Sequence, residues 1–114
     1  MHSKAKPPTK AERKRMADMK DHGCCLCAEL GLGWRLPDNH HILSGGRRMG
    51  HRFTIPLCKW HHEGHPPMTE EMGPSLASSK RAFVSKFGTE LEIMARVDAE
   101  LGFDSVCYGA HIGV

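Results

Sequence analysis

The stretch LCKWHHEGH, residues 57–65, contains one cysteine and three histidines, and both residue types bind transition metals. Cys58, His61, His62 and His65 either bind one metal ion together or are divided between two sites. If they are divided, the stretch is more than a structural zinc site and provides side chains for catalysis. Their partners elsewhere in the chain decide between these alternatives.

Two pairs of residues with metal-ligand spacing predict a structural zinc site. Cys24 and Cys27 form a C-x2-C pair, and Cys58 and His61 form a C-x2-H pair. A two-residue gap lets both side chains of a pair turn towards one ion, and structural zinc takes four Cys or His ligands. Cys25 is the alternative to Cys24, but its one-residue gap to Cys27 suits zinc poorly. We therefore expect Cys25 to be a small buried side chain.

The composition also favours a metal-stabilised protein. The 114 residues are 39% hydrophobic and 6% aromatic, which predicts one domain whose modest core needs an added cross-link. Disulfides are the rival cross-link, but the first residues, MHSKAKPPTK, lack the apolar core of a signal peptide. No run of about 18 apolar residues indicates a membrane span. We therefore expect an intracellular protein, in which closely spaced Cys and His residues are zinc ligands and Cys107 is a partly buried thiol.

The hydrophobic pattern predicts a short sheet with helices before and after it. Thr9 with Glu12, and Thr89 with Glu92, have the spacing of capping boxes and predict helices starting at about Lys10 and at Glu90. Between them we expect a strand ending at HHIL (40–43), a loop SGGRRMGH (44–51), a strand RFTIPL (52–57), a short helix CKWHH (58–62) and a helix SSKRAFVSKF (78–87). The predicted fold class is α+β, with a basic, partly disordered arm and helix at 1–20, the main domain with C-terminal helices at 21–102, and a tail at 103–114.

A second group of histidines is predicted beside the zinc site. On a helix, His62 points about 100° away from His61 and is free for another role. His40 and His41 end a predicted strand, where neighbouring side chains face opposite sides. One of the two can hold a metal with His62 while the other faces a water molecule. Phosphodiester hydrolysis needs a cation on the phosphate and a base for the attacking water, and histidine titrates near the required pH.

This arrangement resembles the HNH (ββα-metal) nucleases. The motifs that carry the resemblance are CCLC (24–27), NHHIL (39–43), Gly50-His51 and LCKWHH (57–62). The resemblance implies that His40 and His62 hold a catalytic metal and that His41 is the general base. His51 is the nearest polar residue to the usual central asparagine, and it would orient the base or bind phosphate.

The chain is also similar to the phage recombination-enhancement nucleases called Ref, which act with the bacterial RecA recombinase. The segments TKAERKRMADMKDHGCCLC, HHILSGGRR, IPLCKWHH and GTELEIMARVDAEL carry this resemblance, over roughly residues 7–102. It implies an HNH core with a helical C-terminal part that cuts DNA where a recombinase filament has paired it. The expected location is the cytoplasm of a bacterial host cell.

Positive charge gathers on the N-terminal arm and on the segment that contains the histidines. Residues 1–20 hold seven Lys and Arg against two acids, and residues 33–62 hold five against one, although the net charge is only +3. A basic patch at a chemical site indicates a polyanionic substrate, with a merely solvated surface as the alternative. The residues predicted to contact the DNA backbone are Arg47, Arg48, Arg52, Lys14 and Arg15.

His65, the catalytic metal and the two tryptophans each allow more than one interpretation. His65 is a possible third ligand of the catalytic metal or a phosphate contact, unless Gly64 ends the helix first. An all-imidazole site suits Mg²⁺ poorly, so DNA oxygens and water would complete the shell of Mg²⁺ or Mn²⁺. Trp34 and Trp60 are expected in the core around the zinc, with base stacking as the alternative.

Two other functions fit the same residues. A non-catalytic, zinc-stabilised module would bind DNA or recombinase without cutting. A recombinase-independent phage nickase would use the same hydrolysis but would cut DNA without a recombinase filament. The sequence does not predict an oligomeric state.

Overall fold

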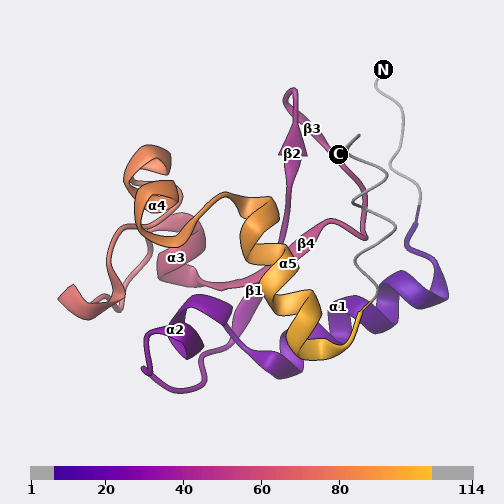
Figure 1. Ribbon diagram of the computed structural model, residues 1–114, viewed down its shortest axis with the longest axis horizontal. Helices are drawn as coiled ribbons and strands as arrows, with labels where there is room; N and C mark the ends of the chain where they lie inside the picture. The colour runs from indigo at the N-terminus through magenta and orange to yellow at the C-terminus, as the bar shows by residue number, and fades with distance from the viewer. Residues whose placement is uncertain (1–6, 104–114) are drawn as a thin grey trace.

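Two antiparallel strands at the centre of the protein organise the helices around them (Figure 1). The computed structural model describes residues 7–103, so the predictions for Cys107, the first six residues and the C-terminal tail lie outside the described part. The α+β fold class is confirmed. The helices are α1 (Lys10–His22), α2 (Cys25–Glu29), α3 (Lys59–Glu63), the 3₁₀ helix η1 (Glu70–Met72), α4 (Lys80–Phe87) and α5 (Glu90–Leu101). The strands are β1 (Pro37–His41), β2 (Leu43–Ser44), β3 (Arg47–Arg48) and β4 (Thr54–Cys58).

The central sheet pairs β1 with β4, with Pro37 opposite Cys58 and His41 opposite Thr54. Every residue of β4 is buried, because helices α1, α2, α3 and α5 all contact this strand. β4 runs directly into α3, so β1, β4 and α3 form a ββα unit. The segment between the two strands was expected to be a loop, but it contains the β2–β3 hairpin, which projects away from the body of the molecule (Figure 1).

The predicted capping boxes set the start of α1 and α5. In α1 the Thr9 hydroxyl accepts the Glu12 N–H at 3.1 Å, and the Glu12 carboxylate accepts the Thr9 N–H at 2.8 Å. Thr89 and Glu92 make the same pair of bonds at the start of α5. Each box satisfies two backbone donors that a helix N-terminus otherwise leaves without a partner.

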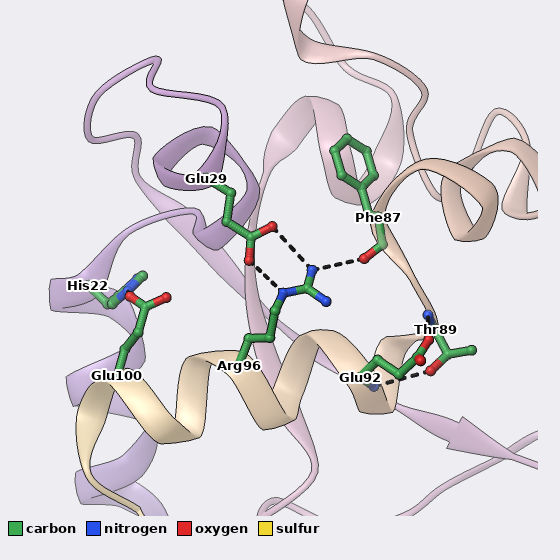
Figure 2. A network of polar contacts seen from close by, with 7 residues as sticks. All are labelled: His22, Glu29, Phe87, Thr89, Glu92, Arg96 and Glu100. Carbon is green, nitrogen blue, oxygen red and sulfur yellow. Dashed lines mark hydrogen bonds and ion pairs between the residues drawn. The ribbon is translucent and has the colours of Figure 1, made fainter.

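Polar contacts hold α5 against the N-terminal half of the protein (Figure 2). The Arg96 guanidinium donates to both carboxylate oxygens of Glu29, at 2.8 and 3.1 Å, and to the carbonyl of Phe87 at 2.8 Å. Further along α5, Glu100 lies 2.9 Å from the His22 ring on α1. These contacts fix α5 relative to α1 and α2, while Ile93, Met94 and Val97 fill the core beneath it.

Arg15 connects three elements, and its predicted contact with DNA is wrong. The Arg15 side chain is 6% exposed, and its guanidinium lies 2.7 Å from Asp98 on α5. It also donates to the Thr54 backbone carbonyl on β4 at 2.9 Å. The charge pattern of α1 cannot distinguish a cation that faces the sheet from one that faces solvent. A buried guanidinium with these partners is a structural group.

Trp34 also differs from the sequence prediction. It is 60% exposed and so is not part of the core around the cysteines, whereas Trp60 is partly buried and packs against that core. The Trp34 ring lies over Gly23, where an added Cβ would come within 2.6 Å of the indole. Among the helices of residues 7–103, none is long and apolar enough to cross a membrane.

The Arg15–Asp98 pair gives a stability prediction. Asp98→Ala leaves a buried, unpaired guanidinium, so we expect a loss of about 3–5 kcal/mol in the free energy of unfolding. Asp18→Ala, which breaks the exposed Lys14–Asp18 pair on α1, is the control and should cost less than about 1 kcal/mol. Urea denaturation measures both values. Equal, small losses in the two variants would contradict the structural role of Arg15.

Candidate active site and metal centre

Four buried side chains from two distant parts of the chain meet at one point. Cys24 and Cys27 come from the start of α2, Cys58 ends β4, and His61 lies on α3. Cys24 caps α2, its sulfur accepting the Cys27 N–H at 3.5 Å, so two predicted ligands sit on a helical turn. The pairs that the sequence analysis combined are therefore brought together.

The distances within this Cys3His cluster suit a tetrahedral metal ion. His61 Nδ1 lies 3.5, 3.7 and 3.3 Å from the sulfurs of Cys24, Cys27 and Cys58, and the Cys27 and Cys58 sulfurs are 3.8 Å apart. Ligands at normal zinc bond lengths lie about 3.5–3.8 Å from each other. His61 Nε2 donates to the Met72 carbonyl at 2.7 Å, which leaves Nδ1 without a hydrogen and facing the sulfurs. The cluster is compatible with a metal ion such as zinc.

The electrostatics of the cluster also favour a cation. Hydrogen bonds from the Cys24 thiol and from the His61 backbone outweigh burial and lower the pKa of Cys58 to about 3. Burial and the neighbouring Cys58 raise the pKa of Cys27 to about 11, and the pKa of Cys24 is raised as well. The cluster therefore stabilises one thiolate on its own, and a cation would be needed to stabilise the others.

A second group of histidines lies on the other side of α3. His40 on β1 and His62 on α3 meet edge to face, with ring centroids 4.9 Å apart. His61 and His62 are neighbours on one helical turn, yet His61 faces the sulfurs and His62 faces β1. The histidines of LCKWHHEGH are therefore divided between two places.

Two carboxylates that sequence reasoning missed complete this group. His62 Nδ1 lies 3.1 Å from Asp38 on β1, and His40 Nε2 lies 2.5 Å from Glu90 on α5. The prediction of a site without carboxylates is therefore wrong. Asp38 precedes His40 by two residues on a strand, so alternation of side chains could have placed both on one face. Glu90 is distant in sequence, and no local signal connects it with His40.

Both carboxylates are held in the charged form. Burial alone would raise the pKa of Asp38, but hydrogen bonds from His62 and Lys59 outweigh it and lower the pKa below its ordinary value. The hydrogen bond from His40 likewise lowers the pKa of Glu90 against the effect of partial burial. Each histidine therefore faces an anion through one ring nitrogen.

His41 lies in different surroundings from its neighbour His40. Its Nε2 is 3.1 Å from His51 Nδ1, and the two rings pack edge to face. Partial burial, and then the charge of Arg48, lower the pKa of His41 below its ordinary value, so the neutral ring is favoured. Both histidines line a cavity of about 410 Å³ together with Pro7, Thr9, Glu12, Arg48 and Gly50.

The other predicted residues lie around these groups. His65 follows Gly64, which ends α3 in a left-handed conformation, and its side chain is 64% exposed with Glu63 at 3.9 Å. It is not part of the His40–His62 pair. Arg47 and Arg48 are exposed on the hairpin, Arg52 is half-buried, and Lys14 is exposed on α1.

A family model matches most of the chain. Residues 8–101 match the model of the family described as "Recombination enhancement, RecA-dependent nuclease". This range covers almost all of the described residues, including both histidine groups and the four-residue cluster. No curated protein and no solved structure matches the chain.

Neighbouring cysteines provide a test of the cluster. We expect the wild type and Cys25→Ala to hold one zinc per chain, and Cys27→Ala to hold none and to unfold. The reason is that a structural zinc contributes about 10–16 kcal/mol, as much as the whole stability of a small domain. Elemental analysis with circular dichroism measures both properties. Zinc retained in Cys27→Ala, or lost from Cys25→Ala, would contradict the ligand assignment.

Proposed function

Because the chain belongs to the family of recombination-enhancement, RecA-dependent nucleases, we propose that it is a metal-dependent DNA endonuclease of the HNH type. The observation that carries this proposal is the ββα unit, which brings His40 and His62 together and sets His41 beside them at a cavity. The preferred substrate is DNA that a RecA-type filament has paired. The Cys3His cluster holds a structural zinc that fixes α3 at the end of β4.

The two paired histidines are proposed to hold the catalytic metal. Each has one ring nitrogen at a carboxylate, so the other nitrogen keeps a lone pair for a cation. DNA phosphate oxygens and water would complete the shell, since two imidazoles alone are a weak site for Mg²⁺ or Mn²⁺. A divalent cation bound here supplies positive charge to the scissile phosphate and to the leaving 3′ oxygen.

His41 is proposed as the general base. Its lowered pKa keeps the ring neutral near pH 7, so it can accept a proton from the attacking water. The neighbouring His51, 3.1 Å from Nε2, orients the ring towards the cavity. The water gives a proton to His41 and its oxygen bonds to phosphorus, while the 3′ oxygen leaves with the electron pair of the broken bond and takes a proton from solvent water. The products carry 3′-hydroxyl and 5′-phosphate ends.

Cations on the hairpin and on α1 are proposed to bind the DNA backbone. Arg47 and Arg48 lie on the projecting hairpin, Arg48 also lines the cavity beside His41, and Lys14 is on the exposed face of α1. Such contacts position DNA without reading its sequence. Arg52, which is half-buried, is proposed to belong to the same set, whereas the buried Arg15 does not.

The nuclease proposal is tested on a labelled DNA displacement loop, with Mg²⁺ and then Mn²⁺, with and without recombinase. We expect the wild type to cut when recombinase is present, and His41→Ala to be about 10²–10⁴-fold slower because the base is lost. His65→Ala, a histidine outside the site, should cut like the wild type. Full activity of His41→Ala would contradict the assigned base.

The same assay separates the alternatives. Equal cutting without recombinase would support the nuclease activity and show that it does not depend on the filament. The absence of cutting by zinc-loaded protein under every condition would favour a non-catalytic module that binds DNA or recombinase.

The hairpin assignment predicts a change in the salt dependence of DNA binding. Replacing both Arg47 and Arg48 by alanine removes two phosphate contacts, so the slope of log K against log salt should fall by about two. Arg81→Ala, an exposed arginine on α4, should leave the slope unchanged. Fluorescence anisotropy on duplex DNA measures the slopes. An unchanged slope in the double variant would place the DNA elsewhere.

A further inference from the structure

Two series of side-chain contacts, each from a lysine through a carboxylate to a histidine, end at the proposed metal ligands. One runs from Lys80 through Glu90 to His40, and the other from Lys59 through Asp38 to His62. Building on the proposed function, we infer that Glu90, at the start of α5, is a positioning residue that fixes the ring of His40 for the catalytic metal. Asp38 has the same role for His62. Helix α5 is thereby part of the active site.

The contacts define which nitrogen each histidine offers. A ring nitrogen that donates to a carboxylate carries the hydrogen, and the other nitrogen then has the lone pair. His40 Nε2 faces Glu90 at 2.5 Å, so its Nδ1 is the donor to a metal. His62 Nδ1 faces Asp38 at 3.1 Å, so its Nε2 is the donor. Metal-binding histidines commonly have a carboxylate partner of this kind.

A lysine contacts each of the two carboxylates, and this contact favours a positioning role for the carboxylate over metal binding. Lys80 Nζ lies 3.5 Å from the second oxygen of Glu90, and Lys59 Nζ lies 3.1 Å from the second oxygen of Asp38. Each carboxylate therefore has one oxygen on a histidine and the other on an ammonium group. An ammonium group at the second oxygen favours orientation of the histidine over direct ligation.

The positions of the possible ligand atoms also indicate that Glu90 and Asp38 orient the histidines and do not bind the metal themselves. Within residues 7–103, Glu90 does not join a set of three or more ligand atoms that all lie within 4.8 Å of one another. Asp38 does join one, with His62 and Glu63, but Lys59 sits between the two carboxylates, 3.6 Å from Glu63. The lysine supplies the positive charge that a cation would otherwise bring to that pair.

The surroundings of Glu90 keep it in place. Its side chain is 11% exposed and that of His40 13%, so the contact is largely shielded from water. Glu90 is the first residue of α5, directly after the Thr89 cap, and the positive end of the helix dipole favours a carboxylate there. The Arg96–Glu29 contacts hold the same helix against α2 (Figure 2).

The test is the titration of zinc-loaded protein with Ni²⁺, a probe ion that imidazole binds well. We expect the wild type to bind one further ion and Glu90→Ala to bind it about 10–100-fold more weakly. Glu90→Gln keeps an acceptor for His40 and should fall between the two. Glu100→Gln is the matched control, since Glu100 lies on the same helix and pairs with His22 at 2.9 Å; its affinity should stay within about twofold of the wild type.

A second measurement distinguishes positioning from a general structural effect. Long-range ¹H–¹⁵N spectra of the zinc-loaded protein should show the His40 hydrogen on Nε2 in the wild type and in Glu100→Gln. In Glu90→Ala the ring should become a mixture of tautomers, with unchanged melting temperature and zinc content. A single Nδ1-hydrogen tautomer in the wild type would overturn the inference, and so would an unchanged ring in Glu90→Ala.

The titration also separates this inference from the function on which it rests. A wild type that binds a further Ni²⁺ with the same affinity as Glu90→Ala overturns the role of Glu90 alone. A wild type that binds no further ion overturns the catalytic metal site and the inference together.

Discussion

The Cys3His cluster is the constraint on which the rest of the structure depends. It joins the turn that follows α1 to the junction of β4 and α3, two segments that are far apart in sequence. Its three cysteines belong to the buried hydrophobic core, and His61 is buried beside them. Fixing His61 on the sulfurs sets the rotation of α3 about its axis. That rotation turns His62 towards β1, so the structural centre also determines the geometry of the proposed catalytic one.

In each of the two pairs of adjacent histidines, backbone geometry points the two side chains in different directions. On the helix, successive residues point about 100° apart, which assigns His61 to the cysteines and His62 to β1. On the strand, successive side chains alternate, which assigns His40 to His62 and His41 to His51 and the cavity. The two pairs thus supply a candidate structural ligand, two candidate metal ligands and a candidate base.

Local patterns were sufficient for the parts of the fold that local interactions determine. The capping boxes at Thr9 and Thr89 and the spacing of Cys24 and Cys27 each act over a few residues. Both capping boxes are confirmed, and Cys24 and Cys27 lie in one cluster that is compatible with a metal ion. Arg15 was misassigned because its burial depends on β4 and α5, which a charge count along α1 does not include. Glu90 was missed because its partner lies on β1, and only tertiary packing brings the two together.

The central claim is that the histidines of LCKWHHEGH are divided between two metal ions, and anomalous diffraction tests it most directly. Crystals of the zinc-loaded protein soaked in Mn²⁺ would be measured at the absorption edges of both metals. We expect zinc among Cys24, Cys27, Cys58 and His61, and manganese at His40 and His62. A single ion shared by His61 and His62, or manganese bound away from His40, would contradict it.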